Sequence, residues 1–198
     1  MEAIQRESPE LELEEKPLTL VEKIQSARWQ TRKEVYVYLA DCLRAGQFLD
    51  DQESSVFAFV EPWLKNMATD TNLICQTEGL QTLLVFVNYS PTVSTSTLLL
   101  GDELIQKCQL NKQKWGDLVN SIVVSLLFKD HDSTLLGHVL KRFFAKNPKE
   151  ACFSMICVRQ ALPGLTCSDN SAKNLLKAIK KAMVHNICLL YTSDAADE

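Results

Sequence analysis

The sequence lacks the features that mark membrane proteins, secreted proteins and the common enzyme classes. No apolar run approaches the roughly 20 residues needed to cross a bilayer, and the Glu-rich first residues are unlike a basic, apolar signal peptide. The motifs G-x-x-x-x-G-K-[ST], G-x-G-x-x-G, H-E-x-x-H and G-x-S-x-G are all absent, and only six glycines are present. We therefore expect a cytoplasmic protein that is not an enzyme.

Cysteine and histidine are too scattered for a metal site. The seven cysteines include no C-x-x-C pair, and His131, His138 and His185 lack the spacing of zinc ligands. Most of the cysteines lie in apolar runs, which is typical of buried, reduced thiols in a reducing compartment. We expect no metal and no cofactor.

The net charge of -4 is unevenly distributed along the chain. Residues 1–16 contribute -4 and residues 188–198 contribute -3, so that residues 17–187, with 19 basic and 16 acidic side chains, carry +3. A mildly basic domain favours an acidic partner, but it is far from the composition of a general nucleic-acid binder. We expect neither a nucleic-acid nor a membrane partner.

Between Pro17 and residue 187 the apolar residues recur at three- and four-residue steps, which predicts short amphipathic helices. A strand pattern competes only at 92–97, a β-branched run that we interpret as a loop. Local signals mark several helix ends: a Thr19/Glu22 capping box, a stop at Gly46, and a start at Asn147 followed by proline and glutamate. Trp63 and Trp115 lie on apolar stripes and are predicted to be core residues.

Breaks within pairs of predicted helices fall near Trp29, Asn72, Lys112 and Lys146, at intervals of 43, 40 and 34 residues. This spacing indicates an irregular array of helix hairpins of the HEAT or armadillo type. The predicted fold is an all-α α-solenoid of HEAT repeats, with about four and a half repeats. Its last helix, around 175–183, has no partner after it.

The sequence divides into three parts. Residues 1–16 are predicted to form an acidic flexible arm, and residues 17–187 the repeat domain. Residues 188–198 resemble a translated sequencing adapter rather than natural protein, which would leave the domain truncated at its C-terminal end; the alternative is a genuine acidic tail.

Candidate binding residues gather at the turns inside the hairpins. In such an array these turns lie along one edge, where the second helix of each pair begins and presents free backbone N–H groups. The alternatives are structural: Trp29 could pack between helices, the lysines could form a solvated edge, and the asparagines could serve only as caps. The residues with basic side chains at these turns are Arg28, Arg32, Lys112, Lys114, Lys146 and Lys149.

The motif W-x-x-R-x-x-x-Y-x-x-L, which runs from Trp29 to Leu39, resembles the opening repeat of TOG domains. These are the tubulin-binding HEAT arrays of the Dis/TOG microtubule polymerases. Three further turns resemble the later TOG turns in the right order, at residues 70–72, 111–114 and 146–149. Gln30 and Asn111 depart from the Lys and Pro that family members usually carry there. The resemblance covers about residues 17–187 and suggests the N-terminal TOG domain of its parent.

The resemblance implies a domain that binds the αβ-tubulin heterodimer, acts as a monomer when isolated, and resides on the cytoskeleton at microtubule ends, the spindle and the microtubule-organising centre. One alternative is a generic HEAT scaffold that binds a peptide in its concave face, with Trp29 buried and the basic turns dispersed. Another is a CLASP-type TOG domain. The tubulin-binding residues that the resemblance implies are Trp29, Arg28, Arg32, Thr71, Asn72, Lys112, Lys114, Lys146, Asn147 and Lys149.

Overall fold

The computed structural model describes residues 18–47, 55–108, 114–165 and 168–192, with the side chains described as far as residue 182 except those of residues 108 and 114. All regular secondary structure in these residues is helical. The elements are α1 (Leu20–Ile24), α2 (Trp29–Ala45), α3 (Val56–Val60), the 3₁₀ helix η1 (Glu61–Trp63), α4 (Leu64–Ala68), α5 (Leu73–Tyr89), α6 (Thr95–Cys108), α7 (Lys114–Phe128), α8 (Thr134–Arg142), α9 (Pro148–Ala161), the 3₁₀ helix η2 (Leu162–Gly164) and α10 (Asp169–Thr192).

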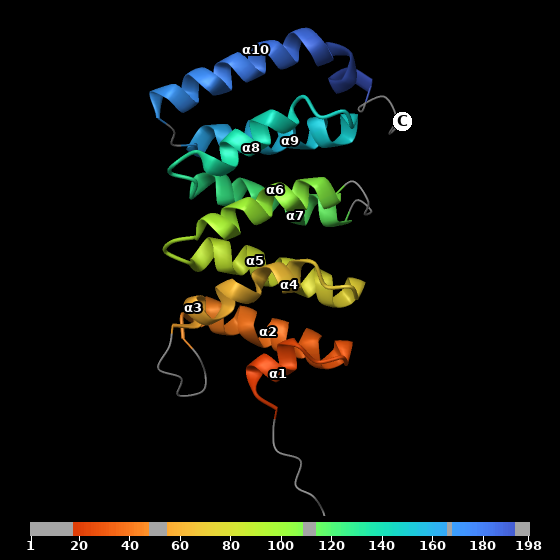
Figure 1. Ribbon diagram of the computed structural model, residues 1–198, viewed down its shortest axis with the longest axis vertical. Coiled ribbons are helices and arrows are strands. Elements are labelled where there is room, and N and C mark those ends of the chain that lie inside the picture. The colour runs from red at the N-terminus through yellow and green to blue at the C-terminus, as the bar shows by residue number, and fades with distance from the viewer. Residues whose placement is uncertain (1–17, 48–54, 109–113, 166–167, 193–198) are drawn as a thin grey trace, which may run out of the picture.

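The helices form antiparallel hairpins that stack along one axis (Figure 1). The second helices of the hairpins, α2, α5, α7 and α9, pack against one another in succession, while α4, α6 and α8 form the other layer. The helix α10 lies beyond the last hairpin and contacts both α8 and α9. The predicted fold class, an all-α array of stacked hairpins, is confirmed.

The hydrophobic core runs between the two layers as one continuous cluster. Its largest fully buried side chains include Tyr36, Leu39, Phe86, Ile105 and Leu126, which come from four different helices. Each hairpin therefore buries its apolar faces partly against its neighbours, which is the source of stability in repeat proteins.

The helix ends that carry local signals form as predicted. Thr19 and Glu22 make the capping box: the Glu22 backbone N–H donates to Thr19 Oγ1 at 3.3 Å, and the Thr19 N–H donates to the Glu22 carboxylate at 2.7 Å. Gly46 ends α2 in the left-handed conformation, with φ of 72°. Pro148 begins α9 behind Asn147, whose side chain accepts from the Lys149 N–H at 3.0 Å.

Pro62 interrupts the helical stretch 56–68, because it has no N–H to donate and a 3₁₀ turn separates α3 from α4. One expectation about an element boundary is wrong. The loop expected over 92–97 ends early, since Thr95 already begins α6. Glu61 accepts from the Ser94 N–H and from the Thr97 hydroxyl, both at 2.8 Å, and these contacts hold the start of the helix.

The helix α10 is longer than expected and continues past the predicted boundary after residue 187. Leu175 is buried, whereas Leu176 is 58% exposed. The predicted acidic arm, the predicted break near Lys112 and the last six residues lie outside the described residues. Within the described part, no helix is long and apolar enough to traverse a bilayer.

Candidate functional site

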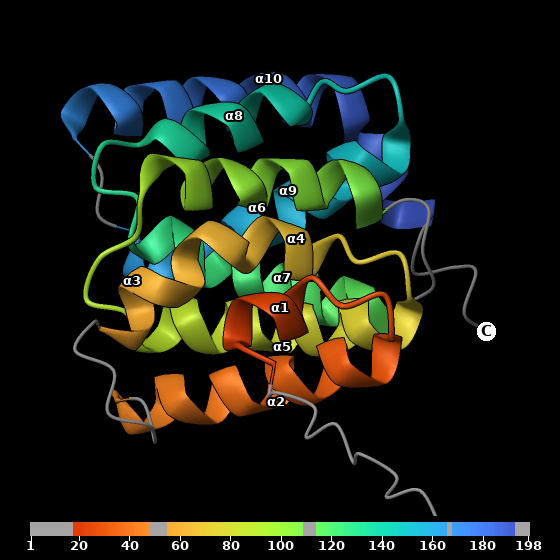
Figure 2. The ribbon, with the colours of Figure 1, turned by 60° about the horizontal axis from the view of Figure 1, so that its bottom comes forward.

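The turns inside the hairpins share one side of the molecule, which we call the turn edge. The helices α2, α5, α7 and α9 all begin on this side, as both views show (Figures 1 and 2). The turn edge is formed by residues 25–28, 69–72 and 143–147 and by the end of α6 and start of α7. The four helices thus direct the positive ends of their dipoles to the same side.

Trp29 is the first residue of α2 and lies at the turn edge. Its side chain is half-buried and packs against the hydrophobic core. Its backbone carbonyl accepts a hydrogen bond from the thiol of the buried Cys75 at 3.1 Å, and burial raises the pKa of that thiol. The residue therefore combines a fixed backbone with an indole that keeps part of its surface open. Trp63 and Trp115, which were predicted to be core residues, are only half-buried and pack against the core from outside it.

Arg28 and Arg32 are placed differently. Arg28 precedes α2 as its N-cap residue and is exposed. The guanidinium of Arg32 instead faces Asp70: Nε and Nη2 donate to the two carboxylate oxygens at 2.7 and 2.8 Å. Nη1 donates to the carbonyls of Ser26 and Ala27 at 2.7 and 3.2 Å. The Asp70 hydrogen bonds raise the pKa of Arg32, so this cation is committed to contacts inside the domain.

Asp70 links the first turn of the edge to the second. Besides Arg32 it accepts from the Tyr36 hydroxyl at 3.0 Å and from the Asn72 backbone N–H at 2.8 Å. Burial opposes ionisation of this carboxyl, but the hydrogen bonds from Arg32, the Asn72 backbone and Tyr36 outweigh it and lower the pKa of Asp70. Burial also raises the pKa of the Tyr36 phenol, and the neighbouring carboxylate adds to this increase.

The lowered pKa of Asp70 predicts a specific loss of stability in acid. The pKa in the folded state lies below the unfolded value of about 3.9, so the stabilisation is complete above that pH and is lost as pH falls through the folded value. Asp70→Asn removes it at every pH. Urea unfolding from about pH 7 to pH 2.5 should show the wild type more stable at neutral pH and the difference shrinking below about pH 4. A difference that stays constant over this range would contradict the assignment.

The second turn carries a cap and two exposed apolar side chains. The Asn72 side chain accepts from the N–H groups of Ile74 and Cys75 at 3.0 and 3.2 Å, so it caps α5, and Thr71 is exposed beside it. The next residues, Leu73 and Ile74, are 63% and 48% exposed. Neither residue was expected to belong to the site. The sequence signal that could have indicated them is a pair of apolar residues directly after a helix cap and before the apolar stripe of the helix, which begins at Cys75.

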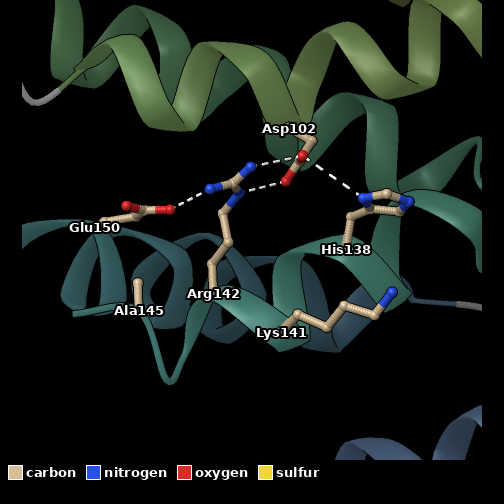
Figure 3. Close-up of a pocket in the computed structure, with 6 residues that line it drawn as sticks. All are labelled: Asp102, His138, Lys141, Arg142, Ala145 and Glu150. Atoms are coloured by element: carbon tan, nitrogen blue, oxygen red, sulfur yellow. Dashed lines mark hydrogen bonds and ion pairs between the residues drawn. The ribbon is translucent and has the colours of Figure 1, made fainter. Parts of the chain in front are cut away.

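The fourth turn presents Lys146 and Lys149 as exposed cations, with Asn147 between them as the cap of α9. Arg142 anchors this turn, because its guanidinium donates to both oxygens of Asp102 on α6 and to the Glu150 carboxylate on α9 (Figure 3). The Asp102 hydrogen bonds are the main reason why the pKa of Arg142 is raised. An open pocket beside this cluster is lined by Asp102, His138, Lys141, Arg142, Ala145 and Glu150.

The structure brings the predicted residues together in two groups. Trp29, Arg32, Thr71 and Asn72 belong to the first two turns, which Asp70 connects, while Lys146, Asn147 and Lys149 lie on the fourth. Lys112 lies outside the described residues. Lys114 begins α7 on the same edge, but its side chain is not described. In the described part, the edge therefore offers an exposed cation and a half-buried indole at its first turn, exposed apolar side chains at its second and exposed cations at its fourth.

Comparison with known proteins identifies the array. The family model "XMAP215/Dis1/CLASP, TOG domain" matches residues 14–186. A relative, "Protein mini spindles" of Drosophila melanogaster, is 26% identical over 171 residues; the alignment covers 86% of this chain and 8% of the relative. This chain thus spans less than a tenth of that protein. No solved structure gives a significant match. Since the family model covers most of the chain, the protein belongs to the XMAP215/Dis1/CLASP family of TOG domains.

Proposed function

We propose that this domain binds the αβ-tubulin heterodimer along its turn edge. Membership of the TOG family supports a role in tubulin and microtubule binding at a general level. The observation that carries the more specific proposal is the position of Trp29, half-buried at the first turn on the same edge as the exposed Lys146 and Lys149.

In this proposal the two ends of the edge make different contacts. Trp29, Leu73 and Ile74 contribute apolar surface at the first two turns, where partly covered aromatic side chains are typical anchors of an interface. The cations of the third and fourth turns engage acidic surface on tubulin. Arg28 adds a further exposed cation beside Trp29, and Thr71 and Asn72 offer polar contacts. No nucleotide hydrolysis by this domain is needed.

For a protein that carries this domain we propose a cytoskeletal location at microtubule ends and the spindle. A TOG domain that prefers curved, unpolymerised tubulin would release it on straightening, because the affinity for the two shapes differs. Serial use of such domains would deliver tubulin to a growing end. A CLASP-type regulator would use the same edge.

Charge reversal tests the electrostatic part of the proposal. Lys112→Glu/Lys114→Glu should weaken tubulin binding about tenfold, and raising salt from about 50 to 200 mM should weaken the wild type more than this variant, because fewer cations remain to be screened. Lys177→Glu/Lys180→Glu is the matched control, since it makes the same change in charge on exposed residues of α10. Titration of fluorescent tubulin gives both affinities. Equal effects of the two variants, or binding that ignores salt, would instead favour a scaffold with a peptide in its concave face.

A further inference from the structure

We propose that Asp70 is a positioning residue for the turn edge. It holds the first two turns in one fixed arrangement, so that Trp29, Leu73 and Ile74 meet the partner as a single preformed apolar surface. This inference rests on the proposed function, and it assigns a role to a residue whose side chain is almost fully buried, with 4% of it exposed.

Both oxygens of the Asp70 carboxylate connect the two turns. Oδ1 accepts from Arg32 Nη2 and from the Asn72 backbone N–H, each at 2.8 Å. Oδ2 accepts from Arg32 Nε at 2.7 Å and from the Tyr36 hydroxyl at 3.0 Å. Because Arg32 also donates to the carbonyls of Ser26 and Ala27, one carboxylate fixes the backbone of the first turn as well as the second.

Two further hydrogen bonds join α2 and α5, the helices that follow the first and second turns, close to the Asp70 carboxylate. The Cys75 thiol donates to the Trp29 carbonyl at 3.1 Å, and the Thr82 hydroxyl donates to the Tyr36 carbonyl at 3.0 Å. Trp29 therefore has its backbone held by α5 on one side and by the Arg32–Asp70 pair one helical turn further on. A surface that is rigid before binding loses less conformational freedom when it binds, and this raises affinity.

The direction in which Asp70→Asn changes the affinity for tubulin distinguishes a positioning role from simple electrostatics. Asp70 is an anion on an edge whose exposed charges are basic in the first and fourth turns, so its removal makes the edge more positive and frees the Arg32 guanidinium. If charge alone decided affinity, Asp70→Asn would strengthen binding to an acidic partner. If Asp70 positions the edge, the same substitution weakens binding, because only a fraction of molecules has both turns in place.

The experiment compares two variants that each break the Arg32–Asp70 pair with a control variant at a different buried aspartate. Asp70→Asn is expected to weaken tubulin binding about tenfold. Arg32→Lys keeps the net charge but loses the paired geometry, and it should weaken binding in the same direction. The control is Asp130→Asn: Asp130 is buried and accepts from the Thr134 and Leu136 N–H groups at 2.8 and 2.7 Å, and it belongs to the connection between α7 and α8. This connection lies on the side opposite the turn edge (Figure 1). It should lower thermal stability and leave affinity unchanged.

Two further measurements distinguish positioning from a general loss of stability. In a Trp29→Ala background, Asp70→Asn should reduce affinity by less than about twofold, because the surface that it positions has lost its anchor. Without tubulin, hydrogen exchange in Asp70→Asn should become faster at residues 29–33 and 69–75 and stay unchanged at 146–151.

Three outcomes would overturn the proposal: unchanged or tighter binding by Asp70→Asn, an equal loss of affinity in Asp130→Asn, or fully additive losses with Trp29→Ala. If the unmodified domain binds no tubulin, the proposed function fails and this inference fails with it. If the unmodified domain binds and Asp70→Asn binds equally well, only the positioning role is excluded.

Discussion

Replacing Trp29 with alanine is expected to weaken tubulin binding by about thirtyfold, which corresponds to about 2 kcal/mol and is typical of an aromatic anchor at an interface. The indole is half-buried, lies at the first turn of the edge and follows the exposed Arg28. Truncation removes the apolar surface that it presents to a partner. The hydrogen bond at its backbone carbonyl does not require the side chain and should remain.

The indole also packs against the core, so its removal could lower affinity by unfolding the domain as well as by removing a contact. The measurement must distinguish these two causes. Circular dichroism should therefore show the helical content of the wild type at the temperature of the binding assay. Tyr89→Ala is the matched control, since Tyr89 is an aromatic residue, 56% exposed, at the far end of α5 on the opposite edge. Co-elution of tubulin in size exclusion that is the same for Trp29→Ala and Tyr89→Ala would exclude Trp29 as the anchor.

The sequence predicts those parts of the fold that short-range chemistry decides. The capping box at Thr19, the left-handed stop at Gly46 and the Asn147–Pro148 start each depend on residues within one helical turn of one another, and each forms as expected. The order of the hairpins follows because stacked pairs are the simplest way to bury helices with apolar faces.

What the sequence does not show is which polar groups face one another across the stack. Arg32 and Asp70 are 38 residues apart, and Arg142 and Asp102 are 40 apart, so neither pair can be found from local spacing. Arg32 was expected to be a partner contact because it is a basic turn residue and because the resemblance to TOG domains implies that role. Its engagement with Asp70 supports the proposed role in positioning, and the partner contacts of the individual turn residues stay predictions. Leu73 and Ile74 were missed because exposure depends on the tertiary arrangement.

The two arginine clusters suggest how an edge made of separate turns can be rigid. Each guanidinium donates to a carboxylate of the preceding or following hairpin and also to a group at or next to the turn of its own hairpin. Arg32 donates to the carbonyls of Ser26 and Ala27, and Arg142 donates to Glu150 just after the fourth turn. Planar guanidinium groups suit this task because their donors are fixed in direction. We therefore infer that Arg32 and Arg142, which face the interior, hold the turns that carry the exposed cations in place.

Gly79→Ala is expected to destabilise the domain by about 3 kcal/mol or more, the largest stability effect that we predict. Gly79 lies in α5 where this helix passes against α4, and a Cβ there would be 2.1 Å from the Met67 carbonyl oxygen and 2.4 Å from its carbonyl carbon. These atoms belong to backbone and cannot move as a side chain can. The two helices of the second hairpin would have to separate, and the contacts of fully buried Met67 and Leu80 would be loosened with them.

The matched control is Gly137→Ala in α8, where a Cβ would meet no atom within 4 Å and the better helix propensity of alanine should add about 0.5–1 kcal/mol of stability. Thermal unfolding should therefore move in opposite directions for the same chemical change, down by about 6–12 °C for Gly79→Ala and up by a few degrees for Gly137→Ala. Gly79 lies only two turns of helix into α5, which begins at the second turn of the edge. A shift of α5 should therefore displace that part of the edge and also reduce tubulin affinity. Equal melting temperatures for the two variants would mean that α4 and α5 are not in close contact at this point, and the second turn would then lack the support on which its position depends.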